Sequence, residues 1–433
     1  MKVAARPPGI PGRAPIKSGA EFPVFLMSTP LSPKRELWLL ITLAGIQFTH
    51  VVDFMVMMPL GPQFTEIFNI SDAKFGLLVS AYTLAAGASG LFASLYVDRF
   101  SRKNLLLVLY VLFALATLAC GLAPSYDSLL LARVAAGTFG GVLTALSQTI
   151  IADVIPFERR GRAMGIVMSS FSVASVAGVP LSLFLAAQFG WHAPFFAIAA
   201  TCGVLALGAW LTLPALAGHL EHQRSSPVAG IVQVLRDRNH QKAFVFTTLL
   251  MFGGFAMIPY ITIFITANGG FTVQQVPYLY LCGGAATLVT ARFIGRWSDS
   301  VGKARMFSYM AIAAVIPMLV LSQSAGFGVW GILLVTTALF IGMNGRMVPG
   351  MALVASAANP QLRGTFMALN SSVQSAAMGA AAFVGGLIIS RDAQGLVQHY
   401  WGNAMVGVVA TVFSLLLVQK LHLYGAPSPS AIK

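Results

Sequence analysis

The stretch SLYVDRFSRKNLLL (residues 94–107) carries four formal charges within six residues and stands between two long apolar segments. The rest of the chain is poor in such groups, because only 9% of its 433 residues are charged and 57% are hydrophobic. Its mean hydropathy of +0.79 is far above that of soluble domains. A short charged segment between apolar runs is typical of a connection between two helices that cross a membrane.

The chain contains twelve runs of about 20 mainly apolar residues, the length that a helix needs to cross roughly 30 Å of hydrocarbon. They lie near residues 38–60, 75–97, 104–123, 128–150, 163–187, 193–214, 243–266, 274–298, 305–323, 329–351, 364–389 and 402–421. The strands of a membrane barrel would alternate apolar and polar residues, which stretches such as LLLVLYVLFALATLACGLA (105–123) do not. The sequence therefore predicts an all-α polytopic membrane protein with twelve transmembrane helices.

Lysine and arginine are distributed unevenly between the connections of these helices. Of the 27 basic residues, 22 lie in the terminal segments and one set of alternate connections, whereas the opposite set holds only Arg391, with Lys74 at a boundary. Because basic connections stay in the cytoplasm, we expect both termini there, in a multi-pass protein of the plasma membrane, most simply a bacterial inner membrane. The net charge of +14 then reflects topology and contact with the lipid bilayer, and no nucleic-acid partner is expected.

The charged stretch has an echo in the second half of the chain. GRWSDSVGKARM (295–306) again sets an aspartate before basic residues, and Asp299 follows Asp98 by 201 positions. PFERRGRAMG (156–165) recurs as PQLRGTFMAL (360–369), which relates Arg160 to Arg363 by a shift of 203. Two matches at nearly one offset indicate tandem six-helix units, related by a pseudo-twofold axis along the membrane normal.

This repeat predicts the domain organisation of the chain. It comprises a disordered cytoplasmic tail (1–36), an N-terminal six-helix bundle (37–216), a cytoplasmic linker (217–242), a C-terminal six-helix bundle (243–421) and a second cytoplasmic tail (422–433). Two similar bundles can rock about a site held between them and expose it to one side of the membrane at a time.

Over residues 37–421 the chain resembles the major facilitator superfamily. The loop signature of that superfamily, G-x-x-x-D-R-x-G-R-K, appears here as Ser94, Asp98, Arg99, Ser101, Arg102 and Lys103, and in the second half as Gly295, Asp299, Gly302, Lys303 and Arg305. Serines replace both glycines of the first signature. The resemblance implies a transporter that works by alternating access, with a small-molecule substrate, protons and the lipid bilayer as its partners, and we expect a monomer.

The expected helix at 163–187 indicates a branch of the superfamily. Gly165, Gly178 and Pro180 stand where the antiporters have their helix 5 pattern, although residues 181–184 lack the usual two glycines after the proline. The stretch is most similar to that of the twelve-helix drug–proton antiporters and the related sugar-efflux proteins. Small residues and a proline also let helices pack closely and bend, whatever the branch.

Asp53 is the one acidic residue of the chain that falls inside an expected helix rather than in a tail, loop or helix end. It lies roughly 12 Å from the end of that helix at 1.5 Å per residue. A carboxylate at this depth must be paired, protonated or hydrated, and such residues are typical of proton-coupling sites. The alternative is an aspartate fixed in a structural ion pair.

Arg133, in LARVAAGTFGG (131–141), lies at a similar depth, roughly 9 Å from its helix end. Equal depth permits a pair with Asp53 without requiring one. By resemblance, an arginine in this L-x-x-R-x-x-x-G setting takes part in proton transfer, and the alternative is a buried structural cation.

Six further polar residues inside the expected helices are candidates for the substrate cavity: His50, Gln148, Asn344, Arg346, Asn370 and Gln374. His50 shares a helix face with Asp53 and could hydrogen-bond its carboxylate. Each of these residues has a structural alternative. His50 could be a buried histidine whose hydrogen bonds are satisfied within the protein, and the Asn and Gln residues could form interhelical hydrogen bonds. The side chain of Arg346 could instead extend to the membrane surface. The sequence has no Walker loop, metal-ligand cluster or nucleophile elbow, so we expect no cofactor and no enzyme.

By resemblance, the opening stretch also forms a latch between the halves. Asp98 is expected at the start of the helix that contains Gly364, where free N–H groups favour an anion, and Arg102 is expected to pair with Asp153. Asp299 is the counterpart of Asp98 in the second half. The alternative is a solvated turn that only fixes orientation.

These observations favour a secondary transporter that exports a small organic molecule in exchange for protons. Two alternatives stay open: uptake of a polar metabolite, coupled to protons or not, and a membrane sensor or scaffold that does not transport.

Overall fold

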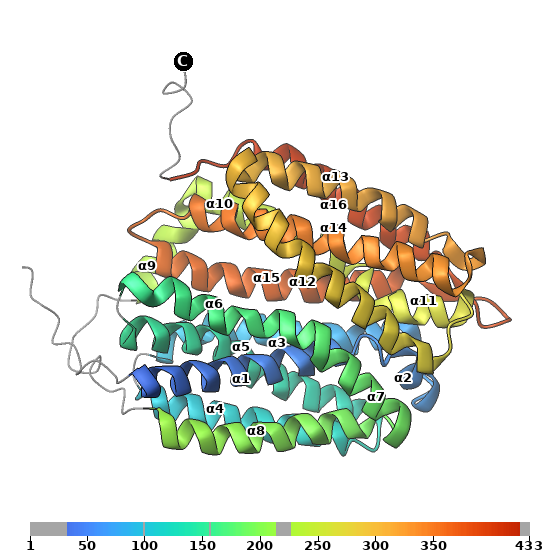
Figure 1. Ribbon diagram of the computed structural model, residues 1–433, viewed down its shortest axis with the longest axis horizontal. Coiled ribbons are helices and arrows are strands. Elements are labelled where there is room, and N and C mark those ends of the chain that lie inside the picture. Colours follow the sequence, from blue (N-terminus) through green and yellow to red (C-terminus); the bar gives the residue numbers. More distant parts are fainter. Residues whose placement is uncertain (1–32, 98–99, 156, 214–226, 425–433) are drawn as a thin grey trace, which may run out of the picture.

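The computed structural model describes residues 33–97, 100–155, 157–213 and 227–424, which are helical along almost their whole length (Figure 1). The first described residues, the last ones and the short helix α9 (Pro227–Arg236) lie at one end of the molecule, on the left of Figure 1. Helix α2 (Gly61–Ile67) lies at the opposite end. We call these the α9 end and the α2 end.

The first half of the chain forms the lower part of Figure 1. Apart from α2, its helices are α1 (Pro33–Val56), α3 (Asp72–Tyr96), α4 (Arg102–Gly121), α5 (Tyr126–Val154), α6 (Phe157–Val173), the π-helix η2 (Ala174–Gly178), α7 (Val179–Phe189) and α8 (His192–Thr212). α6, η2 and α7 continue one another as a single membrane-spanning segment.

The second half forms the upper part of Figure 1. Its elements are α10 (Arg238–Phe255), η4 (Ile258–Tyr260), α11 (Ile261–Asn268), η5 (Val273–Gln275), α12 (Val276–Val301), α13 (Lys303–Leu321), η6 (Ser324–Gly326), α14 (Gly328–Ala357), α15 (Arg363–Ile388), the strands β1 (Ser390–Arg391) and β2 (Val397–Gln398), and α16 (Tyr400–Val418). α10, η4 and α11 again form one spanning segment.

The two halves pack their helices in the same pattern. In the first half α1 packs on α6 and α8, α3 packs on α5, and α4 packs on α5 and α8. In the second half α10 packs on α15 and α16, α12 packs on α14, and α13 packs on α14 and α16. The pattern is the same because each of these helices belongs to the spanning segment that comes six segments after its counterpart in the first half. This repetition confirms the predicted architecture of two six-helix bundles.

Within the described ranges, eleven segments are long and apolar enough to cross a membrane. The remaining one of the twelve predicted spans is α12, which has 26 residues but carries Arg292 together with several Gly, Thr and Tyr residues that lower its hydropathy. It lies in the bundle beside the other helices (Figure 1). The chain is therefore a multi-pass membrane protein.

The first predicted helix is displaced at both ends, because α1 begins at Pro33 rather than near residue 38. The expected helix 38–60 ends at Val56, and residues 57–60 form a turn before α2 begins. Pro59 lies in this turn and Pro62 in the first turn of α2. Because proline has no N–H to donate, it interrupts the hydrogen-bond ladder of a helix. Hydropathy gave no sign of this break, since the turn is as apolar as the helix.

Two seams join the halves. Along the first, α3 packs on α15, and a Cβ atom added to Gly87 would lie 2.9 Å from the carbonyl oxygen of Ser372. Along the second, η2 and α7 pack on α12, and a Cβ atom added to Gly284 would lie 2.9 Å from the carbonyl oxygen of Ser175. The absence of a side chain at Gly87 and Gly284 lets the backbones of these helices come this close.

A bidentate ion pair ties the halves together at the α2 end. Arg391 donates from Nη2 and Nε to the two carboxylate oxygens of Asp72, at 2.8 and 3.0 Å. Asp72 opens α3 in the first half, and Arg391 lies on the hairpin β1–β2 of the second half, where it pairs with Val397. Asn268 of α11 fixes that hairpin by two hydrogen bonds to Val397.

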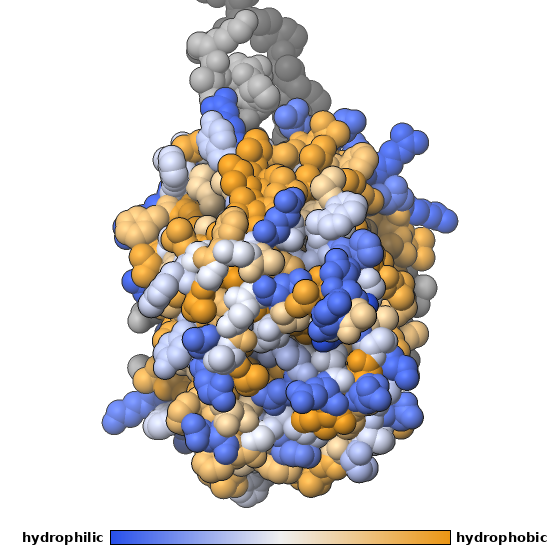
Figure 2. Space-filling model, turned by 90° about the vertical axis from the view of Figure 1, so that its right-hand side faces the viewer, coloured by the Kyte–Doolittle hydropathy of each residue, from blue (hydrophilic) through white to orange (hydrophobic). Residues whose placement is uncertain are grey.

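The hydrogen bonds that Arg391 donates to Asp72 raise the pKa of this arginine above its ordinary value, so the cation of this pair persists at any physiological pH. Figure 2 faces the α2 end, where hydrophilic residues gather among apolar ones. The structure thus represents an arrangement in which the halves are linked at this end.

Replacing Arg391 with Gln should let the halves separate more readily at the α2 end. A partly exposed ion pair contributes about 1 kcal/mol at most, so the separated population should rise by up to about fivefold. The measurement is the rate at which a maleimide labels Ala382→Cys, a buried position on α15, in a chain whose three native cysteines are replaced. Arg305→Gln, an exposed arginine at the α9 end, is the control and should not change the rate. Equal rates with and without Arg391 would contradict the prediction.

Candidate functional site

Asp53 and Arg133 form an ion pair inside the first half. Nη1 of Arg133 lies 2.8 Å from Oδ2 of Asp53 and also donates to the Asp53 backbone oxygen at 3.3 Å. Thr117 of α4 donates to the other carboxylate oxygen at 3.2 Å. Both charged side chains have no exposed surface. Three helices, α1, α4 and α5, therefore hold one buried carboxylate.

The cation of this pair has neutral contacts on its other sides. Its Cζ atom lies 4.3 Å from the ring centroid of Tyr82 on α3, a cation–π contact. Nε and Nη2 of Arg133 have no hydrogen-bond partner among the described residues. Apart from the Asp53 backbone oxygen, the arginine depends on one carboxylate and one aromatic ring, which makes its position sensitive to the charge of Asp53.

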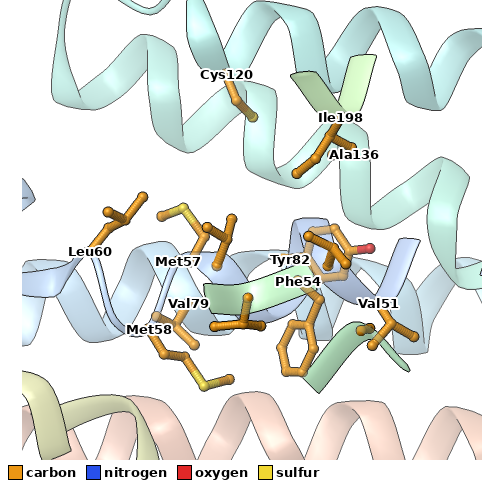
Figure 3. Close-up of a cluster of buried hydrophobic side chains, with 14 of the residues drawn as sticks. Val51, Phe54, Met57, Met58, Leu60, Val79, Tyr82, Cys120, Ala136 and Ile198 are labelled. Carbon is orange, nitrogen blue, oxygen red and sulfur yellow. The ribbon is translucent and has the colours of Figure 1, made fainter. Parts of the chain in front are cut away.

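Tyr82 connects the ion pair to the space between the halves. Its ring stacks on Phe54 with centroids 5.7 Å apart, and Phe54 in turn lies 6.2 Å from Phe255 of the second half. Figure 3 shows Phe54 of α1 and Met58 of the following turn directed to one side and Met57 of that turn directed to the other. Helix α1 therefore presents the carboxylate to its own bundle and aromatic and methionine side chains to the opposite half.

Glycines of α5 make room for this arrangement. The backbone carbonyl of Tyr82 comes so close to Gly137 that a Cβ atom would overlap it. A Cβ atom on Gly140 would lie 2.7 Å from the His50 ring and 2.9 Å from the Tyr82 hydroxyl oxygen. The sequence GTFGG after Arg133 thus lets α3 approach α5 closely, which brings the Tyr82 ring against the guanidinium.

A cavity of about 180 Å³ lies between the halves. Asp53 and Arg133 do not line it. Its lining is mainly aromatic and methionine side chains with a few polar ones: Phe54, Met55, Met58, Phe171, Ser175, Leu250, Gly254, Phe255, Ile258, Tyr280, Gly283, Gly284, Thr287, Phe340, Met343, Asn344, Arg346, Met347, Gln374 and Met378. Among the described residues no group of three or more His, Cys, Asp or Glu residues could hold a metal ion.

The structure brings three of the six predicted cavity residues to this space: Asn344, Arg346 and Gln374. Asn344 donates to the Phe340 carbonyl one turn earlier, at 3.2 Å. Gln148 does not line the cavity. Asn370 is buried inside the second half, where its side-chain oxygen accepts a hydrogen bond from Thr247 of α10 at 2.7 Å. This is the interhelical bond that was the alternative reading of Asn370.

The expected hydrogen bond from His50 to Asp53 is not made. The His50 ring lies between Tyr82 and Phe113, with both centroid distances 5.9 Å, and neither ring nitrogen has a hydrogen-bond partner among the described residues. Residues three apart share a helix face only approximately. The carboxylate of Asp53 is directed to Thr117 of α4 and Arg133 of α5, whereas the imidazole of His50 lies between aromatic rings of α3 and α4.

Arg346 does not reach the membrane surface, as one reading of the sequence expected. Its side chain is 2% exposed and donates to the Thr411 hydroxyl at 2.8 Å and to the Leu250 carbonyl at 3.4 Å. It therefore crosses from α14 between α10 and α16, because the adjacent Gly253 leaves space for its guanidinium. Sequence position alone could not reveal this direction.

The three residues that were expected to form the antiporter pattern lie on α6, η2 and α7 and have different surroundings. A Cβ atom on Gly178 would collide with Val52 of α1, so this glycine allows close packing of η2 on α1. Pro180 lies in the first turn of α7, directly after the π-helix η2. Gly165 of α6 has no described atom near its Cβ position.

The structure describes the expected latch at the α9 end only in part. Asp98 lies outside the described residues, and Asp153 lies in α5 without a described side chain. Arg102 is buried at the start of α4, Asp299 is exposed near the end of α12, and Gly364 is the second residue of α15.

Sequence reasoning missed the bridge between Asp72 and Arg391. The signal was present, because Arg391 was the one basic residue within the connections that otherwise lack them. A basic residue in a connection that is expected to lack basic residues is a reasonable candidate for an ion pair.

Comparison with known proteins agrees with this fold. Residues 43–382 match the Major Facilitator Superfamily. The chain is 27% identical over 395 residues to an uncharacterized MFS-type transporter, YtbD, of Bacillus subtilis (strain 168). The aligned region covers 89% of this chain and 98% of that protein.

Two solved structures have a similar fold at low sequence identity. A D-xylose–proton symporter has a TM-score of 0.73 and 18% identity, covering 88% of this chain and 97% of the other. A bacterial homologue of the human lysosomal transporter Spinster, in an inward-facing and unoccupied conformation, has a TM-score of 0.69 and 16% identity, covering 90% of this chain and 98% of the other.

Breaking the ion pair from one side should destabilise the protein more than removing both charges. Arg133→Met leaves a buried carboxylate unpaired, which should lower the free energy of unfolding by about 3–5 kcal/mol. In the double variant Asp53→Asn/Arg133→Met most of this loss should return, because no buried charge is left. Thermal unfolding in detergent measures the order of stability. Arg292→Met, an exposed arginine of α12, is the control and should change little. A double variant no more stable than Arg133→Met would contradict the prediction.

Proposed function

Because this chain belongs to the Major Facilitator Superfamily, we propose that it is a secondary transporter of the drug–proton antiporter and sugar-efflux type. In this proposal it exports a small organic molecule through the bacterial inner membrane in exchange for protons. The α9 end faces the cytoplasm, in agreement with the basic residues of the connections at that end.

The observation that carries the proposal is the buried pair of Asp53 and Arg133. A proton and the guanidinium compete for the same carboxylate, since a protonated acid no longer attracts the cation. When the acid is charged, it holds Arg133 by a 2.8 Å contact. When the acid takes up a proton, Arg133 loses this charged partner and keeps two neutral ones, the Tyr82 ring and the backbone oxygen of Asp53. Proton binding therefore changes the position of a side chain that links α5 to α1 and α3.

The contact series Phe54, Tyr82 and Arg133 supports a link between the proton and the substrate. Phe54 lines the cavity and stacks on Tyr82, and the Tyr82 ring also contacts the guanidinium of Arg133. A substrate that displaces Phe54 shifts the Tyr82 ring and alters the surroundings of Arg133. Substrate and proton can thus exclude each other without sharing one site, as antiport requires.

The conformational cycle proposed here opens and closes the two ends alternately. With the Asp72–Arg391 bridge formed, the halves are joined at the α2 end. The proposed latch of Asp98, Arg102, Asp153, Asp299 and Gly364 closes the α9 end when the bridge at the other end opens. Gly178, which ends the π-helix η2, and Pro180, which follows it, favour the export branch, because η2 lets the spanning segment α6–η2–α7 bend against α1 and α12.

Transport in reconstituted liposomes tests this function. The probes are 2-naphthalenesulfonate, its neutral sulfonamide and 2-naphthyltrimethylammonium, each loaded inside liposomes with a more acidic bath. Antiport predicts that at least one probe leaves faster because of the proton gradient, while protons enter. In Asp53→Asn the acceleration should fall by about tenfold or more, equivalent to about 1.4 kcal/mol or more, whereas exchange of probe for probe persists.

Asp127→Asn is the matched control, since Asp127 is an exposed acid at the start of α5 and should leave coupling intact. Movement of probe and protons in the same direction would instead indicate uptake. The proposal is overturned if Asp53→Asn keeps full coupling, or if no probe moves with protons, as a sensor or scaffold would behave.

A further inference from the structure

Arg346 is the one charged residue among the described residues that line the cavity. In the part of the chain that the structure describes, it is also one of three arginines that are fully buried, together with Arg102 and Arg133. Arg133 has the carboxylate of Asp53 as its counterion. Arg346, in contrast, has a threonine hydroxyl and a backbone carbonyl as its acceptors, and no carboxylate oxygen of the described residues lies within 4.0 Å of it.

The position of this guanidinium is fixed by the backbone of α10. A Cβ atom on Gly253 would lie 2.5 Å from Nη1 of Arg346, and one on Gly254 would lie 3.4 Å from Nη2. Gly254 itself lines the cavity. The two glycines therefore let the guanidinium lie across α10 and leave one side of it next to the cavity.

The hydrogen-bonding capacity of Arg346 is only partly used. Nη1 donates to Thr411 and Nη2 to Leu250, while Nε is buried and has no partner among the described residues. A buried cation with neutral acceptors alone is strongly unfavourable within a membrane. An anion in the cavity would supply both the missing charge and the missing acceptor, with the planar donor geometry that arginine offers to acidic groups.

The rest of the cavity wall suits an apolar body. Phe54, Phe255 and Phe340 contribute aromatic surface, and Met343 and Met347 contribute flexible thioethers that adapt to ligands of different shape. The wall also has neutral polar side chains, among them Gln374 and Asn344, which precedes Arg346 by two residues on α14. A cationic ligand would find no acidic side chain among the lining residues.

We propose that this cavity binds small organic anions, with a carboxylate, sulfonate or phosphate group at Arg346 and an apolar, preferably aromatic, body against the Phe and Met side chains. This inference rests on the proposed function in one respect, that the cavity is the transport site. It gives the two halves separate tasks: the first half holds the coupling acid, and the second half holds the charge that selects the substrate.

Binding of matched probes to the purified full-length protein in detergent tests the inference. The probes are 2-naphthalenesulfonate, 2-naphthyl phosphate, the neutral 2-naphthalenesulfonamide and 2-naphthyltrimethylammonium, which share one apolar body. The wild type should bind the two anions at least about tenfold more tightly than the neutral probe, as a charge-assisted hydrogen bond implies. The cation should bind more weakly than the neutral probe.

Variants locate the charge that produces this preference. Arg346→Gln should bind sulfonate and sulfonamide equally, and Arg346→Lys should retain part of the preference. Arg292→Gln removes an exposed arginine of α12 and should bind like the wild type. Wild-type binding alone decides the inference if Arg346→Gln does not fold. Failure of the anions to bind, equal binding of anion and neutral probe, or an unchanged preference in Arg346→Gln overturns it.

The same measurements separate this inference from the proposed function. They use no proton gradient, so anion preference can be present in a protein that is not proton-coupled. Asp53→Asn should keep the preference for the sulfonate, because Asp53 does not line the cavity. Proton-coupled transport of the cationic probe alone would retain the proposed function and overturn the anion site.

Discussion

The structure of the first half depends on one buried ion pair. Asp53 and Arg133 lie 2.8 Å apart without contact with solvent, in surroundings where an unpaired charge of either sign would be strongly unfavourable. Their neighbours are arranged around that constraint. Thr117 satisfies the second carboxylate oxygen, the Tyr82 ring covers the guanidinium, and glycine at position 137 lets α3 come close enough to put that ring there. Because the two charges hold each other in place, neutralising one of them frees the other.

The two bundles share a packing pattern but differ in charge. Each repeats the same set of helix contacts, yet the first contains a neutralised pair and the second contains Arg346 with neutral acceptors. These arginines also sit at different points of corresponding helices, the eighth residue of α5 and the nineteenth of α14. An internal repeat therefore conserves the way helices pack while leaving the polar groups free to differ. The proposed division into a proton site and a substrate site follows from this difference.

Much of the fold could be predicted from the sequence, because hydrocarbon thickness and charge distribution leave few alternatives. The twelve spans and the two bundles follow from apolar runs and from the repeat of Asp98 at Asp299. Local breaks were less predictable: α1 ends at Val56 rather than 60, since the proline turn that follows is itself apolar. Composition marks what can enter a membrane, but not where the hydrogen-bond ladder stops.

The site could be predicted as residues but not as geometry. Asp53 and Arg133 stood out because charges are rare inside spans. The directions of His50 and Arg346 depend on glycines of neighbouring helices, at positions 140 and 253, which no property of either residue reveals. The Asp72–Arg391 bridge joins residues more than 300 positions apart and required the relative placement of the two halves.

The central claim is that the carboxyl group of Asp53 takes up and releases the coupling proton. Infrared difference spectra of the protein in lipid, recorded between alkaline and mildly acidic conditions, measure this directly through the carbonyl band of a protonated carboxylic acid. The account predicts a band that appears on acidification in the wild type, is absent in Asp53→Asn, and is retained in Asp127→Asn. A wild type without such a band, or an Asp53→Asn variant that keeps it unchanged, would contradict the account.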